Sequence, residues 1–242
     1  MKRKLIIVFA AVLAVVTVQS AFSTTVFAEE ELVPVWEEKK DHHNKHSLEK
    51  YESLIIHEAE KLEIETEGKK LEDLAKEVFE TNLKNMAKEM GLDAEGKDIE
   101  ELKQQVHHAK VVEKAEELGV ESSGKTPEAL AEEVHEVMVR NKAGELGIDA
   151  AGKDIETLKK EVSSLLITNE AESMGIDVGD KDPDLLKQEI RDRKIAQTAE
   201  ELGINTDTLD TEQQLDEILK HHAVEAKERE LFPFDDKNGK FH

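Results

Sequence analysis

The chain repeats itself every 28 residues across most of its length. One position of the repeat is alanine in six consecutive copies, and it is followed three residues later by Leu or Met and five residues later by an aliphatic residue. The alanines are Ala59, Ala87, Ala115, Ala143, Ala171 and Ala199. A fixed period of this size indicates one small supersecondary unit that is copied and stacked on its neighbours.

Each unit carries the signals for one helix and one loop. Helix starts are predicted where Asp or Thr can accept from the first free amides, twice followed by proline at the first helical position. Helix ends are predicted at a glycine followed by an aliphatic residue, the pattern of a left-handed stop. We predict N-caps at Asp98, Thr126, Asp154 and Asp182, a capping box between Asp98 and Glu101, and stops at Gly91, Gly119, Gly147, Gly175 and Gly203. These signals give helices of about 20 residues and loops of about seven.

The apolar stripe changes face in the middle of each helix. In the helix that starts after Asp98, the first half presents Leu102 and Val106, and the second half presents Val111 and Ala115. At about 100° per residue these two sets point roughly 170° apart. We therefore expect the front half to pack on the preceding helix and the back half on the next. The predicted fold is all-α, an elongated array of about six 28-residue helix-loop-helix repeats with about seven helices.

The N-terminus has the form of a signal peptide, which predicts a secreted protein that is free or held at the cell surface. Lys2, Arg3 and Lys4 precede an apolar run over residues 5–18, and we expect cleavage after Ala28. An uncleaved anchor is the alternative, but the run is shorter than the roughly 20 residues of a membrane span. The predicted divisions are residues 1–28 as signal peptide, 29–46 as a charged, flexible segment, 47–227 as the repeat array and 228–242 as a tail.

The net charge of −23 restricts the partners that the chain can bind. Nucleic acid and anionic lipid surfaces repel such a chain, so neither is expected as a partner. A partner bound through charge would be basic or bridged by a divalent cation. The chain has no cysteine, so helix packing without disulfides must hold it together.

The unit resembles two known groups of proteins. The segment from Leu118-Gly119-Val120 through Gly124-Lys125-Thr126 is similar to the helix-loop-helix of SAP and HeH/LEM-like modules, many of which bind nucleic acid through basic helices. Here acidic pairs such as Glu116-Glu117 stand on the helices, so the resemblance implies the topology without the DNA role. The tandem form also resembles uncharacterised secreted proteins of Gram-positive spore-formers. This resemblance implies a fold and an extracellular localisation but no activity.

Histidines supply the one candidate for a metal site. His42, His43 and His46 are clustered, and His57 follows in the first predicted helix. Neutral imidazole is a preferred ligand of zinc, nickel and copper. The alternative is a solvated polar segment, and the remaining histidines are expected on the surface. The acidic loops lack the ligand order of a calcium loop.

No pattern in the sequence predicts catalysis. His57-Glu58-Ala59-Glu60 is not the zinc-protease motif, because the second histidine is missing. There is no phosphate-binding glycine loop and no cysteine nucleophile, and paired carboxylates carry no information on an acidic helix. We therefore expect a protein that is not an enzyme and has no cofactor, zinc being the one alternative.

Two apolar segments flank the repeats in otherwise charged tails. One contains Trp36, and the other contains Phe232 and Phe234. Exposed aromatic anchors of this kind can dock into a partner's groove. Alternatively, they fold back and cover the open ends of the array. The expected function is an extracellular interaction or spacer module with a protein partner, with self-association left open; the alternative is a divalent-metal binder.

Overall fold

The computed structural model describes residues 48–235, and this part of the chain is all-α with no strand. It confirms an array of helical repeats of similar length. The helices are α2 (Glu52–Lys61), α3 (Leu71–Glu89), α4 (Ile99–Leu118), α5 (Pro127–Glu145), α6 (Ile155–Ser173), α7 (Pro183–Glu201), α8 (Thr211–His221) and α9 (Ala223–Glu228).

The helices begin at the predicted capping residues. The Asp98 carboxylate accepts from the Glu101 amide at 2.9 Å, and Asp154 accepts from the Thr157 amide at 2.8 Å. Thr126 and Asp182 make the corresponding bonds. The reciprocal capping box forms at Asp210 and Gln213, while the side chain of Glu101 accepts from Gln105 instead.

The helices end in the predicted left-handed stops. At Gly119, with φ at 70°, the Val120 amide donates to the Ala115 carbonyl at 2.8 Å. The invariant repeat alanine supplies the accepting carbonyl in the same way at each of the other five stops. All six of these alanines are fully buried. Their short side chain lets the following loop lie close to the helix.

Glu63 occupies the stop of the first repeat, where later copies have glycine. Its φ is 58°, a left-handed conformation that costs an L-residue about 1–2 kcal/mol. We expect Glu63→Gly to raise the free energy of unfolding by about 1 kcal/mol in urea titrations. Gly119→Ala is the reverse control: an added Cβ meets nothing within 4 Å, so a loss of about 1 kcal/mol would come from the backbone alone. Equal stability of all three proteins would contradict the argument.

The core is divided into small clusters that follow the predicted change of face. One cluster joins Val111 and Ala115 of α4 to Leu130 and Val134 of α5. The next joins the back half of α5 to the front half of α6, and the third joins α6 to α7. Each long helix is therefore shared by two cores, and the folding unit is a joint between helices.

A lysine in each of the first five loops is bound to the second turn of the following helix. Lys181 contacts Glu189 at 2.5 Å, and Lys69, Lys125 and Lys153 pair in the same way with the carboxylate eight residues on. Lys97 donates to Gln105 at the equivalent place. The Gly-Lys turn thus has a structural use, since it fixes the loop against its helix.

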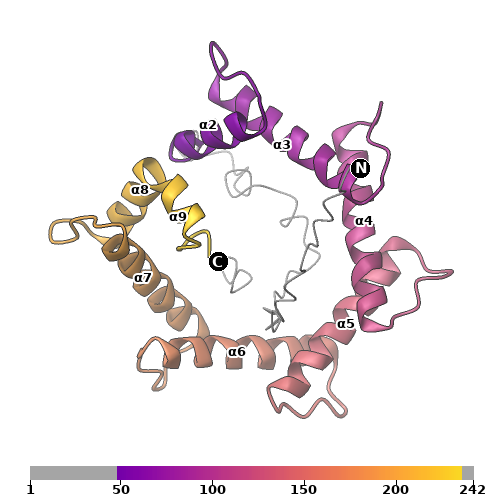
Figure 1. Cartoon of the computed structure of the whole chain (residues 1–242). Coiled ribbons are helices and arrows are strands. Elements are labelled where there is room, and N and C mark those ends of the chain that lie inside the picture. The colour runs from indigo at the N-terminus through magenta and orange to yellow at the C-terminus, as the bar shows by residue number, and fades with distance from the viewer. Residues whose placement is uncertain (1–47, 236–242) are drawn as a thin grey trace, which may run out of the picture.

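The array is a closed ring, so the expected elongated course is wrong (Figure 1). Helix α2 contacts α8 and α9, which lie at the other end of the chain, while the loops project outward. Each joint repeats nearly the same packing, and a small turn in the same sense at every repeat accumulates into curvature. The turn accumulated between α2 and α8 brings the two ends together.

Candidate functional site

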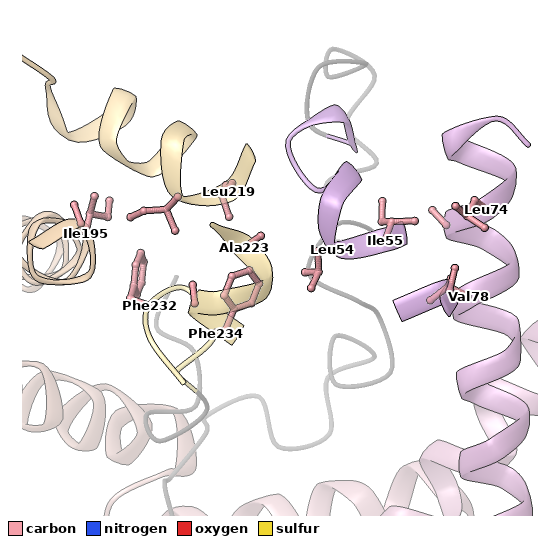
Figure 2. Packing of buried hydrophobic residues seen from close by; sticks show 14 residues of the cluster. Leu54, Ile55, Leu74, Val78, Ile195, Leu219, Ala223, Phe232 and Phe234 are labelled. Atoms are coloured by element: carbon pink, nitrogen blue, oxygen red, sulfur yellow. The ribbon is translucent and has the colours of Figure 1, made fainter. Parts of the chain in front are cut away.

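Phe232 and Phe234 are buried in the core that closes the ring. Their side chains are 5% and 8% exposed. Glu230 takes a left-handed conformation after α9, and the Leu231 amide donates to the Ala226 carbonyl at 2.8 Å, so the chain turns back on itself. Figure 2 shows both rings directed into this core. Both rings are covered rather than exposed, as the fold-back alternative expects, and their docking to a partner stays a prediction. Trp36 lies outside the described residues.

The core around these rings is the place where the two ends of the array meet. It contains Leu54 and Ile55 of α2, and Leu219 and Ala223 from α8 and α9. Ile55 lies toward α3, whereas Leu54 lies toward the C-terminal helices (Figure 2). We call the contact of residues 48–61, which include α2, with residues 211–235 the seam.

Ion pairs surround the apolar part of the seam. Lys50 contacts Asp216 at 2.5 Å, and Lys227 contacts Glu58 at 3.0 Å. All four side chains keep some exposure to solvent. Pairs of this kind contribute up to about 1 kcal/mol each, so the apolar core supplies most of the attraction across the seam.

Lys194 of α7 anchors the C-terminal segment. Its Nζ lies 2.9 Å from a Glu170 oxygen, 3.1 Å from an Asp235 oxygen and 5.9 Å from the centre of the Phe232 ring. Burial by itself lowers the pKa of Lys194, but the two carboxylates outweigh burial and raise it. The ammonium is therefore charged at any physiological pH, and it holds the tail against α7.

The structure covers one of the four predicted metal ligands. His57 lies in α2 at the seam, with Nε2 buried, without a hydrogen-bond partner, and 3.8 Å from a Glu228 oxygen. His42, His43 and His46 lie outside the described residues. Over residues 48–235 there is no group of three or more side chains that could hold a metal ion.

A groove of ≈ 580 Å³ lies between α4 and α5. Gln104, His107 and His108 line it from α4, and Glu128 lines it from the first turn of α5. The Nδ1 atom of His108 is buried and has no hydrogen-bond partner. A backbone hydrogen bond, followed by the Thr126 hydroxyl and the nearby His108, lowers the pKa of Glu128. The groove thus offers a carboxylate, amide groups and imidazoles to a ligand.

His135 occupies, one repeat later, the position of His107. Burial lowers the pKa of His135, and Lys159 lowers it further, while Glu156 opposes them. Its Nε2 atom is buried without a hydrogen-bond partner. The imidazole is therefore neutral in the folded protein at neutral pH.

Acid should destabilise the fold through His135. The unfolded chain binds a proton at this site near pH 6.5, and the folded chain binds it only at lower pH. The stability that the neutral His135 contributes is therefore complete above pH 6.5. It is lost as the pH falls from 6.5 toward the pKa of His135 in the folded protein. We expect His135→Gln to have a melting temperature that changes less between pH 7.5 and pH 5. If the melting temperatures of wild type and His135→Gln changed with pH in parallel, His135 would not contribute to the loss of stability in acid.

Sequence reasoning missed the Lys194 network and the groove between α4 and α5. Lys194 carries no repeat signal that marks it as buried, and its partners Glu170 and Asp235 come together only when the tail folds back. The groove histidines were expected as plain surface residues, because no pattern in the sequence marks the groove that they line. Within residues 48–235, no helix is both long and apolar enough to cross a membrane.

Comparison of the chain with protein-family models, with curated proteins and with solved structures finds no match. The sequence, the ring and the groove are therefore the basis for any functional argument.

Proposed function

We propose that the protein is an extracellular, non-catalytic interaction module that binds a basic segment of a protein partner. The observation that carries the proposal is a division of the repeat into positions that recur and positions that vary. Positions that recur in most copies build the ring: the capping residue, the left-handed glycine, the core leucine and the loop lysine, together with the alanine that all six copies keep. Exposed positions between them change from copy to copy, as in binding scaffolds that present variable side chains on a fixed frame.

The groove between α4 and α5 lies at such variable positions. Position 107 is histidine, as is its equivalent His135, whereas the other equivalents are Ser163, Arg191 and the buried Phe79. His108 is likewise replaced in other copies, for example by Glu136. The carboxylates of Glu101 and Glu128 border the groove and outnumber its one lysine, Lys103, and the chain as a whole has a net charge of −23. These charges favour a basic occupant.

The closed ring favours interaction over spacing. A spacer holds two bodies apart, and its length is the distance between its ends. Here the first and last described helices contact each other, so bodies attached to these two helices would lie side by side. The export part of the proposal rests on the N-terminal sequence. N-terminal sequencing of the protein from the culture medium should give a first residue of Glu29.

The test is capture of a partner from the producing cell's envelope and secreted fractions, with and without chelator. The His107→Ser/His108→Ser variant should lose a saturable partner that wild type retains. Glu136→Ser is the matched control, because residue 136 occupies the position of His108 one repeat later and is outside the groove lining. Absence of a saturable partner, or equal loss in both variants, would contradict the proposal.

Zinc-type metal binding is the second candidate, and the unpartnered Nε2 of His57 near Glu228 favours it. His42, His43 and His46 would supply the further imidazoles. Sub-millimolar zinc should then raise the melting temperature, and changing the three clustered histidines to alanine should remove the gain. A partner lost with chelator would also support this function.

A further inference from the structure

The last copy of the repeat departs from the others at three linked positions. The loops of earlier copies contain a second glycine, such as Gly124 or Gly179, but residues 204–210 contain none. The loop lysine is replaced by Leu209. The buried leucine of the following helix is replaced by Gln214; its equivalents are Leu74, Leu102, Leu130, Leu158 and Leu186.

Gln214 puts a polar group into the joint between α7 and α8. The residue is 9% exposed, and its Nε2 donates to the Leu209 carbonyl at 3.0 Å. Its Oε1 is buried and has no hydrogen-bond partner. A buried acceptor in this state is destabilising relative to the leucine of the other joints. Thr198, also buried, adds a second polar side chain at the end of α7.

The loop before α8 also lacks the contact that fixes the other loops. Glu217 stands eight residues after Leu209, the spacing at which Glu189 accepts from Lys181. Leucine cannot make that ion pair, and Glu217 has His221 as its neighbour at 3.9 Å instead. The loop keeps its backbone turn, in which the Leu209 amide donates to the Thr206 carbonyl at 3.3 Å, but it has neither the lysine contact nor the turn glycine of the earlier loops.

The segment that follows this weak joint binds two surfaces that are far away in the sequence. We call residues 211–235 the clasp. It contacts α7 through Lys194 with Asp235 and through Arg191 with Glu212 at 2.8 Å. It contacts α2 through the seam. Both surfaces belong to the frame of the ring, and the clasp is joined to that frame by one loop.

We propose that the clasp is exchanged between two copies of the chain, so that each copy's clasp closes the other's ring. A second copy presents the same α2 and α7 surfaces, so every contact of the closed ring re-forms between chains. Only the linking loop changes conformation. The seven residues 204–210 can span about 23 Å when extended. The weak α7–α8 joint lets the clasp leave its own ring, which makes exchange possible without global unfolding.

The absence of cysteine gives a direct test. Lys50 and Asp216 face each other across the seam. One tagged chain carries Lys50→Cys and a differently tagged chain carries Asp216→Cys. The two folded proteins are mixed at a series of concentrations and treated with a short bismaleimide. We expect a covalent heterodimer whose yield rises with concentration and time. Mixing the Lys50→Cys chain with a Glu136→Cys chain gives the background, because residue 136 is outside the seam. A yield no higher than this background would overturn the proposal.

Two further variants keep the test decisive. A single chain with both Lys50→Cys and Asp216→Cys should cross-link within itself at low concentration, and failure to do so would remove the closed ring on which the proposal depends. Gln214→Leu should slow formation of the heterodimer about tenfold, because it strengthens the joint that must open. Gln188→Leu, at an exposed glutamine of α7, should leave the rate unchanged. Equal rates for Gln214→Leu and wild type would overturn the role of the weak joint.

Discussion

Phe232→Ala/Phe234→Ala is expected to open the ring while leaving the central repeats folded. Truncating a buried phenylalanine costs about 3–5 kcal/mol, and these two side chains belong to the core that joins both ends. The exposed ion pairs of the seam are too weak to replace that loss. We expect a larger radius of gyration in solution scattering. Hydrogen exchange should become faster in α2, α8 and α9 and stay unchanged in α4, α5 and α6.

Phe79→Ala is the matched control for ring opening. Phe79 is 7% exposed, close to the values of the other two phenylalanines, but it lies in the joint between α3 and α4. Its removal should lower stability locally and leave the closed shape intact. If Phe79→Ala expanded the molecule as much as the double variant did, the closure would not depend on the C-terminal rings.

Leu130→Gln is expected to lower the free energy of unfolding by about 3 kcal/mol or more. Leu130 is 1% exposed in the joint between α4 and α5. The substitution removes apolar contacts and buries an amide. It copies into a central joint the residue that the last joint already carries. Urea denaturation measures the loss, and hydrogen exchange should locate it in the back half of α4 and the front half of α5.

Gln214→Leu is the reciprocal change, and it should stabilise the protein by about 1–2 kcal/mol because it removes the buried unpaired acceptor. If Leu130→Gln lowers the free energy of unfolding and Gln214→Leu raises it, leucine is the more stabilising residue at this position in both joints. A loss of stability in Gln214→Leu would mean that the bond from the amide to the Leu209 carbonyl outweighs the unpaired acceptor.

Local signals were sufficient to predict the helices and the joints. Asp154 and Gly119 fix a helix start and a helix end through bonds to neighbouring residues, so the chain a few residues on either side contains the cause. The change of face between Val106 and Val111 likewise predicts which helix each half contacts. These effects act within one or two repeats, and the structure confirms them.

Closure could not be predicted from the same signals, because it depends on a turn accumulated over all the joints. A small difference in each packing angle separates an open array from a ring, and no single residue encodes that angle. The departures at Leu209 and Gln214 mark the last repeat as different, but they do not show what it contacts. The groove and the Lys194 network were harder still to predict from the sequence, since each combines residues from different helices or from a helix and the C-terminal tail.

Closure also makes the number of repeats a fixed property of the molecule. In an open array, duplication of one 28-residue unit extends the structure and leaves the existing contacts in place. In this ring, an added or deleted unit would displace the C-terminal phenylalanines by one step from the helix that receives them. Unequal recombination within the gene would therefore be selected against, and lineages should keep the repeat count while their exposed residues diverge.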